Sequence, residues 1–505
     1  MPLWLALILP ALPLQLATRA LEQPGPLVVV EGPAQRPVVV FCNRAAADCG
    51  VTPGQKLAAA QALAQPLLAV ARNREREHST LLELAGWTYQ FSAQISPRNC
   101  LTSGLLLETG ASGKLFGGHA RLHRRIERGL AALGFQATFG YAATPQAAWW
   151  IASARAIGLR CPDAIDDDRP EAALAPLPLH LTGWETSILE SLHALGLVTL
   201  GDVLALPRDQ LNRRFGTMPL ADLDRALGRL ADPQPLFAPP ATFFARLELP
   251  ADVIEAEQLM FPAHRLLRSL EGFLRGQDAG TTELGFTITH HSRRARPVPP
   301  TRVALTLAAP ERDARRLAQL LAERLARVQL PEPAVTLALG VDQLQPFAPR
   351  HASLLPPAPG VSHLMADTDW QQLAETLHAR LGSERVFQLQ AIDDHRPEHA
   401  YRTLPLVVHA GERRRGRPTG PRRPLLILPQ PAPLEQSDET PTFEGALRLV
   451  AGPERIESGW WDFGSPSRNP VFRDYFVARN PRGQTLWIYR ELAAPRRWFL
   501  HGFFA

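Results

Sequence analysis

The sequence predicts an α+β protein of several domains, and three observations point to this class. The chain has 505 residues, whereas a single hydrophobic core stops growing at about 250 to 300 residues. Hydrophobic residues make up 45% of it and charged residues 20%, which is ordinary for a globular protein. Strand and helix patterns alternate early in the chain, an all-helical stretch follows, and strand patterns return towards the end.

The first residues are predicted to form a buried strand. Leu5 and Leu7 belong to one apolar face and Ala6 and Ile8 to the other, as a strand covered on both sides requires. A secretory signal is the alternative, because small residues near positions 17–20 follow the apolar run. Two prolines interrupt the run and no Lys or Arg precedes it, so we favour the strand. Sequencing of the mature N-terminus would distinguish the two.

Strand and helix patterns alternate through the next part of the chain. Two β-branched runs, PLVVVEG and RPVVVFC, flank a Gly-Pro turn and predict a strand pair. Residues 76–92 and 119–133 are predicted helices, and the pieces GLLLETG and QATFGYA are predicted strands.

The later parts of the chain each show a different pattern. Residues 185–230 are predicted to be helical, and the piece LHALGLVTLGDVLALP predicts a helix, a tight hairpin and a second helix. Residues 243–347 predict a βαββαβ sheet of four strands backed by two helices. Residues 348–440, rich in Pro and Arg, are predicted to be mostly linker with a helical island near 368–381. The aromatic tail, residues 443–505, predicts a small β-rich module.

Charge and cysteine content say little about function by themselves. The formal net charge is +5, and Lys56 and Lys114 are the only lysines. Since this skew towards arginine looks like GC-rich coding, only clusters of arginine indicate nucleic-acid binding. The four cysteines lack CxxC spacing, so neither a metal site nor a disulfide framework is predicted. A reducing cytoplasm fits this pattern.

Six stretches carry a family resemblance. They are LWLALILPALPLQLA, VVVFCNRAAADCGVTPGQKLAAA, GLLLETGASGKLFGG, FGYAATPQAAWWIASA, LGLVTLGDVLALP and GPERIESGWWD. In this order they resemble the Y-family translesion DNA polymerases, and most of all the ImuB branch, over essentially the whole chain. The ending from GPERIESGWWD to WFLHGFFA is the part that ordinary Y-family polymerases lack.

The resemblance implies a division into the parts of a Y-family polymerase. The expected parts are palm-like residues 1–24 and 76–168, fingers-like residues 25–75, a helix-hairpin-helix thumb-like part at 169–238, a little-finger-like part at 239–347, a Pro/Arg-rich linker with a clamp-like peptide at 348–440, and a C-terminal interaction module at 441–505.

The resemblance also implies where catalytic acids would stand. Polymerases use two metal ions, about 4 Å apart, which carboxylates must hold. With Glu108 aligned as the last acid of its motif, Ser103 and Gly104 take the place of the family's Asp-Glu pair, and Ala6 lies near the place of the first acid. Residues 1–20 contain neither Asp nor Glu. We therefore predict no metal site, no cofactor and no catalytic residue.

The nucleotide site is incomplete in the same way. The family's Tyr and Arg that hold the triphosphate correspond here to Arg44 and Ala47. An unrelated acidic site is left open at residues 166–168 or 393–394, although a solvated loop is the plainer interpretation of both polar stretches.

Two features predict DNA binding. The Gly-rich turn of a helix-hairpin-helix can present backbone N–H groups to a phosphate, and the residues in that turn are Gly196, Thr199, Leu200 and Gly201. An ordinary αα-corner is the alternative. In the piece HHSRRARP, the end of a strand carries Arg293, Arg294 and Arg296, which are suited to binding backbone phosphates. A solvated hairpin turn is the alternative interpretation.

Three further features predict protein contacts or flexible arms. In the family, a peptide like Gln-Leu-x-Leu-Phe after the little finger inserts apolar side chains into a sliding clamp. Here HASLLPP supplies the candidates His351, Ser353, Leu354 and Leu355, without the Gln and the aromatic residue, so an unstructured linker stays open. Six arginines within residues 413–423 predict a basic arm or a solubilising linker.

The aromatic tail is the third of these features. Its tryptophans are candidate partner contacts, although a core role for most of the aromatic residues is the safer interpretation. The candidates are Trp460, Trp461, Trp487 and Trp498.

The predicted function is that of a non-catalytic adaptor. The resemblance implies a DNA- and clamp-binding subunit of an error-prone translesion complex in the DNA damage response. Its partners would be primer-template DNA, the β sliding clamp, an ImuA-like RecA-related protein and an ImuC-like error-prone polymerase, with no membrane contact. The alternatives are an active lesion-bypass polymerase with displaced carboxylates and an exported protein.

Overall fold

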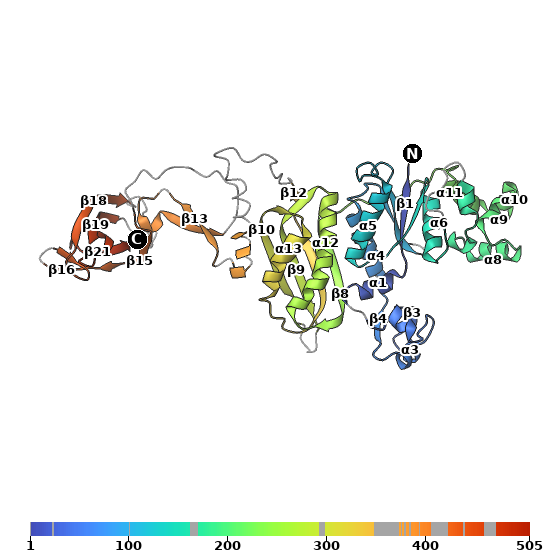
Figure 1. Cartoon of the computed structure of the whole chain (residues 1–505), viewed down its shortest axis with the longest axis horizontal. Helices are drawn as coiled ribbons and strands as arrows, with labels where there is room; N and C mark the ends of the chain where they lie inside the picture. The colour runs from blue at the N-terminus through green and yellow to red at the C-terminus, as the bar shows by residue number, and fades with distance from the viewer. Residues whose placement is uncertain are drawn as a thin grey trace. The chain divides into compact units, whose positions relative to one another are not determined.

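The computed structural model describes two compact units, Met1–Arg380 and Leu381–Ala505 (Figure 1). The described residues are 2–22, 25–99, 102–161, 170–291, 298–347, 423–437, 440–458 and 471–504, together with most of 373–405. The α+β multidomain class predicted from the sequence is confirmed. Among these residues, no helix is both long enough and apolar enough to cross a membrane.

The first sheet has the strand order β5-β6-β1-β7. Its strands are Trp4–Leu9 (β1), Ile95–Asn99 (β5), Ser103–Glu108 (β6) and Thr138–Ala142 (β7). Helices α1 (Leu12–Thr18), α4 (Arg74–Thr88), α5 (His119–Leu133) and α6 (Pro145–Ala156) accompany it.

Strand β1 is central and is covered on both faces. Leu5 and Leu7 pack in one core with residues of α4 and α5, whereas Ala6 and Ile8 pack in another with residues of α6. Figure 1 shows α5 and α6 on opposite sides of β1. The predicted doubly covered strand is confirmed, because both of its faces are apolar.

A small three-stranded sheet, ordered β3-β2-β4, lies between β1 and α4 in the chain. Its elements are Leu27–Glu31 (β2), Val38–Cys42 (β3), Arg44–Asp48 (α2), Leu57–Leu63 (α3) and Leu68–Ala71 (β4). The predicted antiparallel pair β2-β3 is confirmed. Strand β4, which runs parallel to β2, was not predicted.

The predicted helical stretch is confirmed. It consists of Thr186–Ala194 (α8), Leu200–Leu204 (α9), Arg208–Phe215 (α10) and Thr217–Ala226 (α11), preceded by Pro170–Leu174 (α7) and a 3-10 turn, Leu179–Leu181. Leu192, Leu200 and Leu223 share a core with Trp150 of α6. These helices are therefore anchored on the first sheet through α6.

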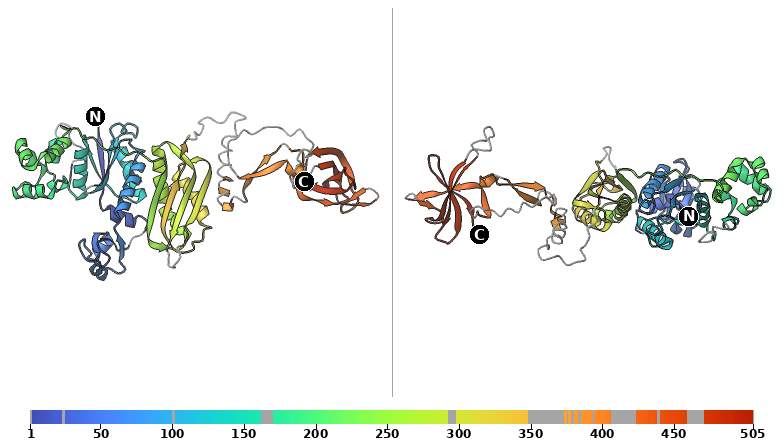
Figure 2. Two further views of the ribbon diagram at one scale, coloured as in Figure 1. Left: turned by 180° about the vertical axis from the view of Figure 1, so that it is seen from behind. Right: turned by 90° about the horizontal axis from the view of Figure 1, so that it is seen from above.

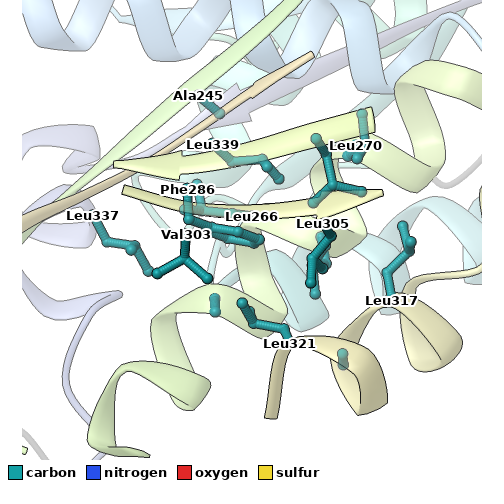
Figure 3. Close-up of a cluster of buried hydrophobic side chains, with 14 of the residues drawn as sticks. Ala245, Leu266, Leu270, Phe286, Val303, Leu305, Leu317, Leu321, Leu337 and Leu339 are labelled. Atoms are coloured by element: carbon teal, nitrogen blue, oxygen red, sulfur yellow. The ribbon is translucent and has the colours of Figure 1, made fainter. Parts of the chain in front are cut away.

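The βαββαβ part forms a second sheet in the order β10-β9-β11-β8, as predicted, with a short strand β12 (Gln345–Pro346) beside β9. Its strands are Phe243–Val253 (β8), Ala279–His290 (β9), Thr301–Glu311 (β10) and Ala334–Val341 (β11), and its helices are Met260–Gly276 (α12) and Ala314–Leu325 (α13), with a 3-10 turn at Ala256–Leu259. Figure 3 shows Leu266 of α12 and Leu317 and Leu321 of α13 packed against Val303 and Leu305 of the sheet. The helices cover one face only.

Close packing at glycines joins the two sheets. Trp87 of α4 is buried between α5 and α12, and a Cβ atom at Gly129 or Gly272 would overlap its ring. Gly276 also lies close to the end of α4, because a Cβ atom there would be 3.0 Å from the backbone N of Gln90. Since neither α5 nor α12 carries a side chain at the contact with Trp87, the helices approach closely.

The C-terminal unit contains a five-stranded sheet in the order β15-β21-β20-β19-β18. Its strands are Leu426–Pro433 (β15), Arg448–Ser458 (β18), Val471–Arg479 (β19), Thr485–Glu491 (β20) and Trp498–Phe503 (β21). Two short hairpins add Phe387–Ala391 (β13), Tyr401–Pro405 (β14), Glu435–Ser437 (β16) and Thr440–Thr442 (β17), with a 3-10 turn at Pro397–His399. The β-rich tail is confirmed.

The predicted linker at residues 348–440 is wrong for its later part. Residues 387–391 and 426–433 form strands, and the second of these completes the C-terminal sheet. Its prolines suggested a linker, but β15 is an edge strand that pairs only with β21, and an edge strand can lack N–H groups on its open side. Described residues within 373–381 are helical, in agreement with the predicted island.

Replacing Gly272 by alanine is expected to destabilise the protein. The helix propensity of alanine adds about 1 kcal/mol of stability, but the new methyl group overlaps Trp87, and overpacking a core costs about 1–3 kcal/mol. Thermal unfolding should therefore show a lower Tm for Gly272→Ala. The control is Gly285→Ala in β9, where a Cβ meets nothing within 4 Å. An unchanged Tm for Gly272→Ala would contradict the close packing of the Trp87 ring against Gly272.

Candidate nucleic-acid interface

The strand pairing of the first sheet shows which residues lie opposite one another at the positions where catalytic acids were expected. Gly104 pairs with Ile8 of β1, whereas Ala6 pairs with Leu106. Directly opposed residues bring their Cβ atoms to about 4.5–5.5 Å, so the partner of an acid at Gly104 would be Ile8. The residue that directly opposes Gly104 is thus Ile8, two positions along β1 from Ala6, and both Ala6 and Ile8 are apolar and fully buried.

Gly104 cannot hold a side chain in this packing. A Cβ atom there would overlap the carbonyl oxygen of Leu7 and lie 3.1 Å from the Trp149 ring. The hydroxyl of neighbouring Ser103 donates to Asn99 Oδ1 at 2.9 Å. A carboxylate at 104 would require Trp149 and β1 to move apart.

An arginine stands beside this position on the other neighbouring strand. Arg98 of β5 pairs with Gly104, and its guanidinium lies 5.4 Å from the centre of the Trp149 ring. It donates to Gln146 Oε1 at 3.2 Å and to Gln234 Oε1 at 3.0 Å. Its charge is partly compensated by Asp232, whose Oδ2 lies 3.8 Å from the guanidinium, but a guanidinium beside Gly104 still disfavours the binding of a cation there. Within the described part of the chain, no group of three or more His, Cys, Asp or Glu residues has the arrangement of a metal site.

Glu108, the one acid at a family position, supports the backbone. Its Oε1 accepts hydrogen bonds from the backbone N–H of Leu3 at 3.1 Å and of Gly110 at 2.8 Å, and Oε2 accepts one from Ala111 at 3.4 Å. The carboxylate therefore ties the beginning of β1 to the turn after β6.

The other candidate polar residues are scattered. Arg44 is exposed at the start of α2, and Ala47 is exposed in the same helix. Of the two acidic groups, residues 166–168 and 393 lie outside the described residues. Asp394 accepts two short hydrogen bonds from Arg396, at 3.0 and 2.7 Å, and this pairing lowers the pKa of Asp394. It is a salt-bridge partner rather than part of a solvated loop.

The predicted hairpin exists between α8 and α9, but its donors are occupied. Gly196 has a φ of 78° and is exposed, as a tight turn requires. Every backbone N–H from residue 195 to 201 donates within the protein. In particular, Asp202 Oδ2 accepts from Val198 at 3.0 Å and from Thr199 at 2.9 Å. The expectation that this turn offers free N–H groups to a phosphate is wrong, because backbone carbonyl oxygens and the Asp202 carboxylate already accept their hydrogen bonds.

The remaining residues of the hairpin serve its own structure. Thr199 caps α9 in a capping box with Asp202, and Leu200 is buried. A Cβ on Gly201 would come within 3.0 Å of Ala175 Cβ, so this glycine allows close packing with the segment after α7. The tip exposes two apolar side chains, Leu195 and Val198.

A wide open surface lies elsewhere, on the uncovered face of the second sheet (Figure 2, left). Small and hydroxyl side chains dominate it, and the central ones are Gly285, Thr287, Ala304, Thr306, Ala338 and Gly340. Arg302 is exposed on this face, opposite Thr287. The alternation in TRVALTL was the signal in the sequence, which predicted the strand but not its role. Exposed Phe244, Arg246 and Glu248 of β8 and Glu283 of β9 stand on the same face around this centre. The small side chains of the centre itself allow close approach of a duplex backbone.

Arg293, Arg294 and Arg296 lie outside the described residues, in the connection from β9 to β10. His290, at the end of β9, is buried and structural: Nδ1 lies 2.8 Å from the carbonyl oxygen of Glu332, and Nε2 lies 2.7 Å from Thr301 Oγ1. The open face and the predicted arginines thus belong to the same strand pair.

The predicted protein contacts fall into two groups. His351, Ser353, Leu354, Leu355, Trp460 and Trp461 lie outside the described residues. Trp487 and Trp498 are buried in two separate cores of the C-terminal sheet, and Trp487 stacks on Tyr475 with ring centres 4.2 Å apart. A surface role for these two tryptophans is corrected, because alternate positions along a strand face two cores instead of one core and solvent.

Comparison with known proteins supports the family resemblance. Residues 14–153 match the model of the impB/mucB/samB family. The chain is 29% identical over 475 residues to Protein ImuB of Caulobacter vibrioides strain NA1000 / CB15N, covering 90% of this chain and 100% of that protein, and the same values hold for Protein ImuB of strain ATCC 19089. The resemblance to the ImuB branch is confirmed.

Solved structures with similarity include Y-family DNA polymerases. A chimera of the polymerases Dbh and Dpo4 is 16% identical, with a TM-score of 0.37, and the match covers 67% of this chain and 98% of the chimera. An insertion ternary complex of Dbh DNA polymerase is 14% identical, with a TM-score of 0.38, and covers 68% and 99%. DinB from Sulfolobus solfataricus is 14% identical, with a TM-score of 0.35.

Replacing Glu108 by alanine is expected to lower the free energy of unfolding by about 1–3 kcal/mol, because backbone N–H groups lose their acceptor. Glu108→Gln retains one acceptor oxygen and should lose less. Urea unfolding of both variants measures this, with exposed Glu127→Ala on α5 as the control. Equal stability of Glu108→Ala and the unmodified chain would show that the carboxylate has no structural role.

The contribution of Asp202 to stability is expected to depend on pH. Hydrogen bonds from Val198 and Thr199 lower the pKa of Asp202 in the folded state, so its stabilising effect is present above the unfolded pKa of about 3.9 and disappears as pH falls through the folded pKa. Asp202→Asn should therefore have a lower Tm near neutral pH, and the difference should shrink in acid. A difference independent of pH would contradict this assignment.

Proposed function

We propose that this ImuB-like chain is a non-catalytic adaptor of an error-prone translesion complex, which holds DNA and proteins without joining nucleotides itself. The observation that carries the proposal is the environment of Gly104. An aromatic ring closes the position, an arginine lies beside it and isoleucine stands opposite. Two-metal catalysis needs carboxylates from neighbouring strands. The packing around Gly104 and Ile8 disfavours a carboxylate at either position.

DNA binding is assigned to the second sheet rather than to the hairpin. The uncovered face offers close approach, and Arg302 offers a charge to a phosphate. The proposal extends to Arg293, Arg294 and Arg296, which continue from β9. Such contacts go to the backbone and read no sequence, which suits a protein that must act at any lesion.

The protein contacts belong to the proposal as well. The clamp would be held by residues 351–355, and an ImuA-like RecA-related protein and an ImuC-like error-prone polymerase would use the C-terminal unit, including Trp460 and Trp461. Linking several weak sites raises the local concentration of a polymerase at a lesion without any new contact. The cytoplasm, as the compartment of the DNA damage response, is part of the same proposal.

The test combines primer extension with DNA affinity. The purified chain, with Mg²⁺ or Mn²⁺ and all four nucleotides, should add no nucleotide to a primer, whereas incorporation would establish the alternative of an active polymerase. Arg302→Glu should weaken binding to primer-template DNA and reduce the slope of log affinity against log salt by about one. Exposed Arg327→Glu, beyond α13, is the control and should bind normally.

Partner binding is tested with a deletion placed by the structure. Because β15 belongs to the C-terminal sheet, the deletion should begin at residue 381 and not at 443. The full chain should retain the clamp, the ImuA-like protein and the ImuC-like polymerase in a pull-down, and the shortened chain should lose the last two. Retention of both by the shortened chain would exclude the C-terminal unit as their site.

A further inference from the structure

A groove of about 580 Å³ lies along the seam between α5 and α12. It is separate from the open sheet face, because α12 covers the opposite face of that sheet. Its walls carry Arg125 and Arg128 from α5 and Arg268 and Arg275 from α12. All four arginines are exposed.

The charges in the groove are unbalanced. Glu271 is its one acid and already accepts a hydrogen bond of 2.6 Å from Arg275. Among the described residues, Arg125, Arg128 and Arg268 form no salt bridge. Four guanidinium groups against one carboxylate leave a concentrated positive charge in a concave site, which attracts anionic groups.

The floor of the groove is aromatic. Trp87 and Phe91 are buried and meet edge to face, with ring centres 5.3 Å apart. Phe116 is half-buried beside them, and the guanidinium of Arg125 lies 5.6 Å from its ring centre. The next residue to Phe116 in the chain, Leu115, is 83% exposed. Arginine and aromatic groups beside an exposed apolar side chain are the composition of a protein interface.

We propose that this groove binds an acidic peptide segment of a partner protein, with carboxylates on the four arginines and an apolar side chain against the exposed Leu115 beside Phe116. Single-stranded nucleic acid is the competing anion, but its bases need open ring faces on which to stack. Trp87 and Phe91 are buried, and Arg125 lies over Phe116, so the floor offers little such surface. The inference does not depend on the proposed adaptor function.

The experiment uses the full chain and fluorescence anisotropy. The probe is a short labelled peptide of Asp and Glu around a central Phe-Leu pair, and its comparison peptide has Asn and Gln in place of the acids. The acidic peptide should bind, and the comparison peptide should not. The double variant Arg128→Glu with Arg268→Glu should weaken binding at least about tenfold, since two favourable pairs become repulsive.

The matched control is Arg121→Glu with Arg124→Glu, which makes the same change in charge on exposed positions of α5 that do not line the groove. It should bind the peptide normally, and the Tm of both double variants should match that of the unmodified chain. The proposal fails if the unmodified chain does not bind the peptide or if both double variants lose it equally. It also fails if the groove variant loses affinity for labelled oligo-dT while it keeps the peptide, because the groove would then be a nucleic-acid site.

Discussion

Burial of β1 on both faces is the constraint on which the rest of the first unit depends. Leu5 and Leu7 hold α4 and α5, and Ala6 and Ile8 hold α6, which in turn carries the helical stretch. A carboxylate on this strand would be a charge in a fully buried position, and removing a charge from water costs several kcal/mol unless a metal or a cation compensates it. The apolar packing that organises the unit is therefore one physical reason for the proposal that this strand carries no acid for two-metal chemistry.

The sequence predicted the elements of this unit because their patterns are strong. Alternation that is apolar on both faces identified β1, and helical periodicity identified α5 at its observed bounds. The site was less predictable, since it depends on pairing between strands. Only the register showed that Ile8 and not Ala6 opposes Gly104, and only the packing showed Arg98 and Trp149 beside it.

Other corrections arise where one residue type has two physical uses. Glycine at 196 makes a tight turn, but glycine at 201 permits packing against Ala175, and a motif does not separate these uses. The three prolines of β15 suggested a linker, although an edge strand tolerates them. Trp487 and Trp498 suggested a partner-binding surface. The C-terminal sheet has a core on each face, so aromatic side chains on both faces of its strands are buried.

Trp87 is part of the packing that positions both proposed binding surfaces, the open sheet face and the arginine-lined groove. Because Gly129 and Gly272 let its ring pass between α5 and α12, the second sheet is held against the first, and the same ring forms the floor of the arginine-lined groove. The groove lies on the helix-covered side of that sheet, and the face assigned to DNA lies on the other. An acidic partner in the groove and a duplex on the open face would thus contact different arginines. Binding of one therefore leaves the other surface available, which is the arrangement that an adaptor with several simultaneous partners needs.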